Sequence, residues 1–257
     1  MITAIWGCGG VGKSAIACGL GNLYAARGTA AVIDSNLCQP TLPQRLPGVR
    51  LDAERSLGRY LNRLGDSEVR RYYHQHPDNK GLFFAGLTDR DAYTDFEIGL
   101  EAADRAREFL ARSDEMFDHV LLDCSAQRND PFLPAMLRHA GRIVLPIVPG
   151  IGAVHWYNAV QPMLENAGVL EKIVPVAAMV LPFYLTDEVE RQMGTAFAAR
   201  FRFSRELARR IDEGRLPDGL LEADGANWSK NLRLLAKALS PDEGNLFMDE
   251  ETAVDAP

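Results

Sequence analysis

The stretch Ile2–Ser14, ITAIWGCGGVGKS, joins a short apolar run to a glycine-rich run that ends in lysine and serine. From Gly7 onward it fits the pattern G-x-x-x-x-G-K-[ST] at every fixed position. Residues 2–6 have the composition of a strand, and a helical pattern begins at Lys13. Glycines let backbone N–H groups converge on a phosphate, and the helix N-terminus adds its dipole. The stretch therefore predicts a phosphate-binding loop (P-loop); the alternative is a chance glycine-rich turn.

The P-loop predicts which residues hold a nucleotide and its metal. Lys13 is expected to contact the β- and γ-phosphates, and the Ser14 hydroxyl is expected to ligate Mg²⁺. A P-loop also needs an acid on a neighbouring strand, and Asp123 fits that role through a water; the alternative is an acid that only ends a strand. The predicted cofactor-binding residues are Gly7, Gly9, Gly10, Val11, Gly12, Lys13, Ser14 and Ala15.

Outside the P-loop, short apolar runs alternate with longer amphipathic ones. This pattern predicts an α/β fold of three layers, a mostly parallel twisted sheet with helices on both faces. The predicted strands are residues 2–6, 30–34, 81–85, 119–123, 142–148 and 174–181. The predicted helices are residues 13–27, 52–64, 66–74, 100–113, 131–140, 154–167, 187–200, 204–213 and 227–239, and Ser204 is expected to cap the eighth of these.

Composition excludes several classes of protein. Of the 257 residues, 47% are apolar and 25% charged, which are values of globular proteins, not of collagen-like, disordered or coiled-coil chains. We expect one domain over residues 1–240 and an acidic, mobile tail over 241–257. The tail holds six acidic residues and no basic one, which leaves 29 acidic and 28 basic residues in the domain. The net charge of −7 therefore does not exclude DNA or an acidic partner.

The chain start, the cysteines and the tail predict a location. The start MITAIWGCGG lacks the basic segment and long apolar core of a signal peptide, and no apolar run approaches the roughly 20 residues of a membrane span. Four cysteines without a CxxC pair predict reduced thiols rather than a zinc ribbon. The tail lacks the cationic face that a membrane-binding helix needs. We expect a cytoplasmic protein without a membrane anchor.

Three motifs in order, GCGGVGKS, VIDSNLCQPTL and FDHVLLDCSAQ, resemble those of the ParA/MinD family of deviant Walker A ATPases. The likeness covers most of residues 1–240. It implies that ATP and Mg²⁺ bind and order the loop after Asp34, which changes the affinity for a protein partner. It also implies that Lys13, Asp34 and the residue at position 36 act in catalysis, and that two copies form a nucleotide-sandwich dimer.

The chain departs from the family pattern at three positions of chemistry. The family motif KGGxGK[ST] has a lysine that reaches across the dimer, and here that position is Cys8. The second acid of the family's DxD motif is Asn36, which orients water but is no base near neutral pH. An asparagine that reads adenine is missing from residues 179–182, MVLP. We expect ATP binding with slow or no hydrolysis, as in the atypical TadZ and CpaE proteins of pilus assembly.

Two other functions stay open at this stage. A scaffold that no longer uses nucleotide fits Cys8 and Asn36, although the intact Lys13 opposes it. A DNA partition ATPase fits an arginine-rich segment, whose exposed side chains Arg205, Arg209 and Arg210 would contact phosphates; the alternative is a solvated helix face. Finally, the histidines of RRYYHQHPD, His74 and His76, are expected on a polar helix end or loop rather than at a metal.

Overall fold

The computed structural model describes residues 1–62, 68–92 and 99–240. Within them, eight strands form one sheet in the order β3-β4-β2-β5-β1-β6-β7-β8. All neighbouring strands are parallel except β3, which is antiparallel to β4. The strands are β1 (Ile2–Ile5), β2 (Ala30–Asp34), β3 (His74–Gln75), β4 (Leu82–Ala85), β5 (His119–Asp123), β6 (Arg142–Ile147), β7 (Ile173–Val180) and β8 (Arg200–Arg202).

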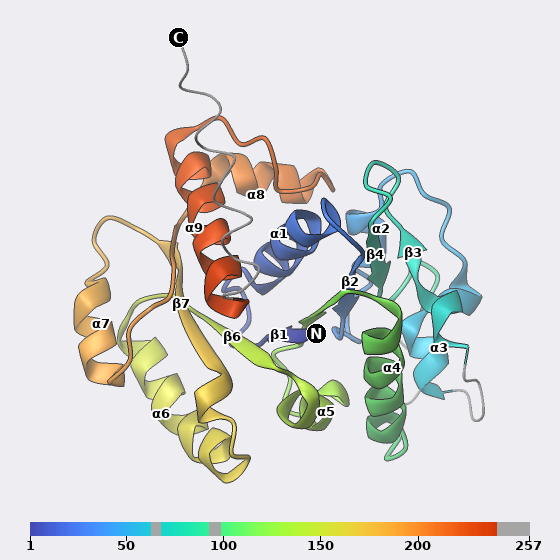
Figure 1. The fold of residues 1–257 in the computed structure, drawn as a ribbon, viewed down its shortest axis with the longest axis horizontal. Helices are drawn as coiled ribbons and strands as arrows, with labels where there is room; N and C mark the ends of the chain where they lie inside the picture. The colour runs from blue at the N-terminus through green and yellow to red at the C-terminus, as the bar shows by residue number, and fades with distance from the viewer. Residues whose placement is uncertain (63–67, 93–98, 241–257) are drawn as a thin grey trace.

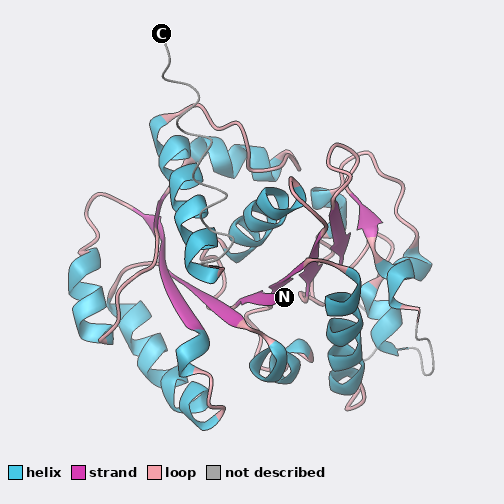
Figure 2. Cartoon of the chain, viewed as in Figure 1, coloured by secondary structure: helices cyan, strands magenta, loops and turns pink. Residues whose placement is uncertain are grey.

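Helices cover both faces of the sheet, so the predicted three-layer α/β fold is confirmed (Figures 1 and 2). The helices α1, α8 and α9 lie on one face, and α4, α5 and α6 lie on the other. The α-helices are α1 (Lys13–Ala25), α2 (Leu42–Arg45), α3 (Leu57–Asn62), α4 (Ala102–Met116), α5 (Phe132–His139), α6 (Ile151–Asn166), α7 (Thr186–Met193), α8 (Arg205–Asp212) and α9 (Ala223–Leu239). Three 3₁₀ turns are η1 (Ala53–Arg55), η2 (Val69–Tyr72) and η3 (Leu170–Lys172).

The central strands are buried on both faces, and their side chains alternate between two hydrophobic cores. In β2, Ala31 and Ile33 belong to one core, whereas Ala30 and Val32 belong to the other. This alternation follows from the period of two in a strand. Burial of one such Ile or Leu side chain contributes about 1.5 to 3 kcal/mol, which explains the nearly continuous apolar runs in the sequence.

The edge strand β8 is protected by the last helix. Asn231 and Asn227 of α9 accept hydrogen bonds through Oδ1 from the backbone N–H groups of Arg200 and Arg202, at 2.9 and 3.2 Å. On the same face Trp228 packs so closely on Gly19 of α1 that a Cβ there would lie 2.4 Å from its ring. The helix α9 thus covers an otherwise unpaired edge and packs on the helix that follows the P-loop.

Three predicted helices are wrong in part. The predicted helix 52–64 is, in its described residues, the 3₁₀ turn η1 followed by the short helix α3. The predicted helix 66–74 is, in its described residues, the turn η2 followed by strand β3, because Tyr72 and Tyr73 are both buried and their ring packing needs an extended chain. The predicted helix 187–200 ends at Met193, where Gly194 adopts φ +67° as a left-handed cap. Arg200 therefore begins β8 instead of ending a helix. The predicted acidic tail, 241–257, lies outside the described residues.

Candidate functional site

The loop between β1 and α1 has the backbone form of a phosphate cradle. Gly10 and Gly12 adopt φ +71° and +81°, the left-handed region that glycine enters without strain. A Cβ at either position would meet nothing within 4 Å, so the space beside the loop is open. Gly12 caps α1 without a side-chain hydrogen bond, which leaves the N–H groups of the first helical turn to a ligand.

Lys13 is the cation of this loop. Its Nζ donates to the carbonyl oxygens of Cys8 at 2.7 Å and Gly7 at 3.3 Å. Its side chain is held against the loop, and the residue is 9% exposed. Burial raises the pKa of the Cys8 thiol, so Cys8 stays neutral at physiological pH and adds no charge. Cys8 therefore adds no positive charge to the loop.

Two buried carboxyl groups lie side by side at the carboxyl ends of the central strands. Asp34 ends β2, Asp123 ends β5, and the two are register partners. Burial raises the pKa of both groups, and the charge of Asp34 raises that of Asp123 further, to about 7. The Ser14 hydroxyl donates a hydrogen bond to Asp123, which opposes this shift. The structure thus brings the predicted metal-site residues Ser14 and Asp123 into contact.

The segment after Asp34 is folded back on the Asp34 carboxylate. Asp34 accepts hydrogen bonds from the Asn36 N–H at 2.9 Å and from the Thr41 hydroxyl at 2.5 Å. The Asn36 Oδ1 accepts from the N–H of Cys38 at 3.1 Å, so the amide carbonyl of Asn36 is engaged in its own loop. In this conformation Asn36 supports a turn of its own loop.

The sequence analysis did not predict a role for Arg45 or for the hydrogen bonds that Ser35 makes next to Asp34. Arg45 ends α2, and its charge lowers the pKa of Asp34 and Asp123 against the larger effect of burial. The Ser35 hydroxyl donates to Asp130 at 2.5 Å and accepts from the N–H of Ser125 at 2.8 Å, which ties the ends of β2 and β5 together. No short motif connects these residues, although Ser35 directly follows Asp34.

A small apolar pocket of about 130 Å³ opens beside the P-loop. Gly12 and Ala15 form one side, and side chains from β7, the segment after β8, α8 and α9 form the other, among them Met179, Phe203 and Leu207. Met179 adopts φ +51° at an irregularity of the β7–β8 pairing. The absence of the family's asparagine from residues 179–182 is thus matched by an apolar wall.

The arginine-rich segment divides into engaged and exposed side chains. Arg210 donates to the carbonyl oxygens of Asp218 and of Gly219, the latter at 3.0 Å, and so clamps the chain after α8. Arg205 and Arg209 are exposed, and no ion pair of theirs falls within the described residues. Ser204 caps α8, as predicted, because its Oγ accepts from the Leu207 N–H at 3.2 Å. Two of the three predicted DNA-contacting residues therefore face solvent, whereas Arg210 serves the fold.

The two histidines of residues 74–76 lie differently from the prediction. His74 is in strand β3, and both His74 and His76 are buried, at 4% and 3% exposure, so a polar surface is wrong. Among the described residues, no group of three His, Cys, Asp or Glu side chains has the geometry to hold a metal. None of the described helices is both long and apolar enough to span a membrane.

Comparison with solved structures shows many proteins of the same fold. The chain is similar to the MinD septum site-determining protein of Pyrococcus horikoshii complexed with Mg-ADP, with 17% identity and a TM-score of 0.72 over 93% of this chain and 97% of that one. It is similar to a plasmid partition protein of Borrelia burgdorferi bound to AMPPNP, with 15% identity and a TM-score of 0.71 over 92% and 98%. It is also similar to a ParA family ATPase of Chlorobium tepidum, with 15% identity and a TM-score of 0.69 over 94% and 98%.

These structures share the P-loop NTPase fold with the chain over nearly its whole length. No model of a protein family matches the sequence. No curated protein matches it either. At this level of identity the likeness is one of fold, and the chemistry of the site rests on this chain's own residues.

Proposed function

We propose that the chain is an ATP-binding switch protein of the ParA/MinD family, a degenerate variant in which binding is kept and hydrolysis is slow or absent. One observation carries the proposal: the open P-loop places Lys13 and Ser14 next to the buried pair Asp34 and Asp123. A chance glycine turn would not also align two strand-ending acids with the serine that follows its lysine. Residues 1–240 form the working domain in this proposal.

The residues of the loop fit a nucleotide and Mg²⁺. The N–H groups from Gly9 to Ala15 bind phosphate oxygens, and Lys13 exchanges its loop carbonyls for them. Mg²⁺ supplies charge neutralisation on the phosphates when bound. Ser14 would hold the metal, and Asp123, which is hydrogen-bonded to Ser14, would orient a water bound to it. The pocket lined by Met179 and Phe203 receives the base through apolar contact, which gives weak discrimination between bases.

Slow turnover follows from two side chains. Asn36 is no base, and its carbonyl oxygen is bound to the Cys38 N–H, so a water next to the γ-phosphate gains little from it. The neutral Cys8 gives no charge to a partner's nucleotide. Of the family's catalytic residues, Lys13 and Asp34 remain, and we assign the protein at most a slow ATPase activity, hydrolysis of ATP to ADP and phosphate.

The switch acts through the segment after Asp34. Asp34 holds Asn36 and Thr41, and Gln44 donates to the Ile211 carbonyl at 3.3 Å, so this segment also contacts α8. A nucleotide that changes the charge beside Asp34 shifts the position of this segment and with it a protein-binding surface. We place the output in the positioning of a cytoplasmic assembly, a pilus or secretion machinery or a DNA partition system, with a homodimer as the nucleotide-bound form.

The decisive experiment is an equilibrium titration with a fluorescent ATP analogue and Mg²⁺. Wild type is expected to bind, and Lys13→Ala is expected to bind at least a hundredfold more weakly because charged hydrogen bonds are lost. Lys237→Ala, at the exposed end of α9, is the matched lysine control and should bind as wild type. If wild type and Lys13→Ala bind equally poorly, the chain is the scaffold that no longer uses nucleotide.

A phosphate-release assay tests the degenerate state separately. Asn36→Asp restores the family acid and Cys8→Lys restores the family lysine, and the double variant is expected to hydrolyse ATP at least tenfold faster than wild type. Asn36→Gln, which adds no acid, should leave the slow rate unchanged. A wild-type rate equal to that of the double variant would contradict the weakened turnover while leaving nucleotide binding intact.

A DNA-contacting role for α8 has one observation in its favour, the exposure of Arg205 and Arg209 without ion pairs in the described residues. Retention on non-specific duplex DNA with ATP and low salt tests it. The double variant Arg205→Gln, Arg209→Gln should abolish retention on DNA. The control is Arg191→Gln: Arg191 pairs with Glu188 on α7, and its replacement should leave retention unchanged. Retention that survives the first pair would remove DNA from the partners of this surface.

A further inference from the structure

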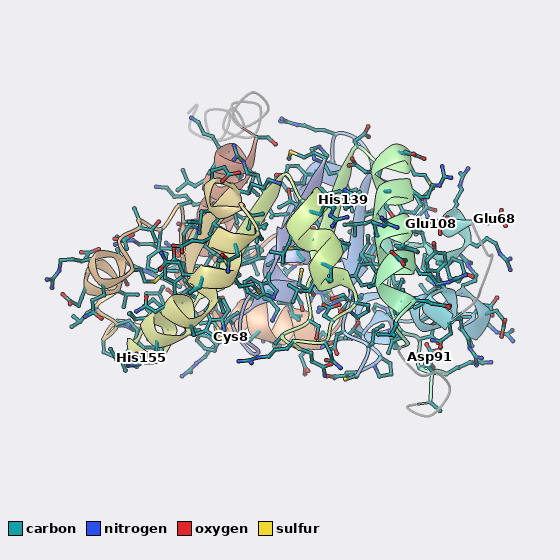
Figure 3. All side chains as sticks on the ribbon, turned by 90° about the horizontal axis from the view of Figure 1, so that it is seen from below. Cys8, Glu68, Asp91, Glu108, His139 and His155 are labelled. Atoms are coloured by element: carbon teal, nitrogen blue, oxygen red, sulfur yellow. The ribbon has the colours of Figure 1, made fainter. Side chains whose placement is uncertain are left out.

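A large cavity on the described part of the chain lies away from the P-loop. Its volume is about 740 Å³, and it is lined by Thr29, which directly precedes β2, by Phe117, two residues before the start of β5, and by the edge strand β3. Asp34 and Asp123 lie at the other, carboxyl ends of β2 and β5, and the P-loop follows the carboxyl end of the neighbouring strand β1. Figure 3 labels Cys8, which marks the P-loop in that view. The cavity is thus distinct from the nucleotide site.

The charge on this cavity is positive. Arg50, Arg55 and Arg70 line it, and none of its described lining residues is acidic. Arg55 donates to the carbonyl oxygens of Arg71, at 2.6 Å, and of Tyr73. Arg50 and Arg70 are exposed, and their guanidinium groups make no hydrogen bond or ion pair within residues 1–62, 68–92 and 99–240. Among the described residues, two guanidinium groups therefore line the cavity without an ion pair to a carboxylate.

Nearby acids are engaged elsewhere. Asp118 accepts from the N–H and the hydroxyl of Thr29, both at 2.8 Å. Asp52 accepts a hydrogen bond from the Glu54 N–H at 3.0 Å and so caps η1. Its charge also raises the pKa of His74, against the larger effect of burial. Neither carboxylate is hydrogen-bonded to a cavity arginine, so an incoming anion does not have to displace an ion pair.

His74 adds a buried polar group without a partner. It lines the cavity and is 4% exposed, and its Nε2 makes no hydrogen bond. Burial and the charge of Arg55 lower the pKa of His74, so the ring is neutral at pH 7. Its other nitrogen donates to the Arg55 carbonyl, which leaves Nε2 as an acceptor. A buried acceptor without a partner is costly, and a ligand donor would relieve that cost.

The remaining walls are aromatic and apolar. Tyr73 and Phe83 both pack against Phe117, with ring centroids 4.7 and 5.2 Å apart, and Met116 lies beside them. These rings and the planar guanidinium groups present flat surfaces on which another ring can stack. The volume is within the range of pockets that bind small organic molecules.

We propose that this cavity is a binding site for a small organic anion that carries an aromatic ring and a hydrogen-bond donor. The anionic group pairs with Arg50 and Arg70, the ring stacks among Tyr73 and Phe117, and the donor meets the Nε2 of His74. The site is separate from the nucleotide site and does not depend on the function proposed for it.

The test uses two probes that differ only in charge. 8-Anilinonaphthalene-1-sulfonate has a sulfonate, and N-phenyl-1-naphthylamine has the same rings and N–H without it. Fluorescence titrations of the full chain should show that the sulfonate probe binds wild type at least tenfold more tightly than the neutral probe. In the double variant Arg50→Gln, Arg70→Gln this preference should be lost, a weakening of about tenfold or more for the sulfonate probe alone.

Matched controls separate this site from general dye binding. Arg107→Gln with Arg112→Gln removes two exposed arginines of α4 that pair with Asp104 and Glu115, and it should leave both titrations unchanged. His74→Phe should weaken both probes to a similar extent, because both donate an N–H. Circular dichroism checks that each variant is folded. Binding of the sulfonate probe to the Arg50, Arg70 variant within twofold of wild type would overturn the proposal.

Discussion

The two ends of strands β2 and β5 have opposite electrostatic character. At the carboxyl ends Asp34 and Asp123 are buried and partnered, and the P-loop beside them presents backbone N–H groups and Lys13. At the amino ends, beside Thr29 and Phe117, the charged groups that line the large cavity are arginines. Each end of the sheet is thus able to receive an anion, but by different means.

Parallel strands explain the difference. Helices begin at the carboxyl ends of the strands and finish near the amino ends, as α1 and α4 do at Lys13 and Met116. Helix N-termini favour anions, and helix C-termini favour cations. The carboxyl end therefore offers main-chain dipoles to a phosphate. The cationic groups at the amino end are instead arginine side chains from the loop before η1, from η1 and from η2, and the last turns of α1 and α4 contribute none. The first arrangement is rigid and the second adaptable.

The largest expected difference between the two ends is the pH dependence of stability without nucleotide or metal. The pKa of Asp123 is raised to about 7 from 3.8. Between pH 4 and 7 the unfolded chain has released this proton and the folded chain retains it, so the free energy of unfolding falls as pH rises. The free energy of unfolding should fall by roughly 2 to 4 kcal/mol, because the pKa of Asp123 is raised by about three units and part of this shift arises from its interaction with Asp34. Urea denaturation at pH 5 and pH 8 measures it.

Two variants sharpen this prediction. Asp123→Asn keeps the shape and an acceptor for Ser14 but carries no charge, so it should flatten the pH profile and be more stable than wild type at pH 8. Arg45→Met removes the cation that lowers the pKa of Asp123 and should move the fall to higher pH. A wild-type profile that Asp123→Asn leaves unaltered would place the titrating group elsewhere.

The next largest effect is the independence of the two anion sites. Lys13→Ala should weaken Mg-ATP by at least a hundredfold and leave 8-anilinonaphthalene-1-sulfonate at the cavity within twofold. Arg50→Gln with Arg70→Gln should do the reverse. Titrating both ligands against both variants measures the full comparison. If either variant weakens the binding of both ligands by tenfold, the two sites are coupled or one ligand binds at the other's site.

The difference between the ends also explains what the sequence predicts. The P-loop is contiguous, and its glycines and Lys13 have fixed spacing, so sequence alone indicates their role. Strand-ending acids such as Asp34 and Asp123 follow from the parallel order, because carboxyl ends meet at one edge. The apolar runs predict all six long strands, with ends that differ by at most one residue.

The amino-end cavity has no such signature. Its arginines come from the loop before η1, from η1 and from η2, and only the antiparallel pairing of β3 brings them near Phe117. The two-residue strand β3 is too short for a period-two pattern, and buried aromatic residues before it imitate a helix. Arg45 likewise reaches the acids only through the path of α2. Residues that tertiary packing alone brings together remain invisible to local patterns.

Glycine substitutions should separate fold from function at the two ends. Gly81, at the amino end of β4, has the carbonyl oxygens of Ala25 and Gly28 only 2.5 and 2.6 Å from where a Cβ would stand. Gly81→Ala should lower the free energy of unfolding by about 1 to 3 kcal/mol, because backbone atoms cannot move aside easily. At the P-loop the nearest atom to a Cβ on Gly9 is 3.9 Å away, in Ala126.

Gly9→Ala is therefore the matched variant at the other end. Its stability should stay within about 0.5 kcal/mol of wild type, while its affinity for Mg-ATP falls, because the methyl group enters the space where phosphate approaches the loop. Thermal unfolding and the nucleotide titration together measure the contrast. Equal destabilisation by the two substitutions would show that the P-loop is packed rather than open.

The smallest effect concerns a carboxylate at the amino end whose pH dependence has the opposite sign. Hydrogen bonds from the Thr29 N–H and hydroxyl lower the pKa of Asp118. The stability that they contribute is present above the unfolded pKa near 4 and is lost as pH falls through the lower folded value. Thr29→Val removes the hydroxyl alone, and because Asp118 is exposed the loss at pH 7 should be only about 0.5 kcal/mol. The stability lost in Thr29→Val should become smaller as the pH is lowered toward 3. The destabilisation by the buried charge of Asp123, in contrast, disappears between pH 7 and pH 4. Denaturation of Thr29→Val and wild type at pH 7 and pH 3 measures this, and a loss that grows on acidification would contradict the sign assigned to Asp118.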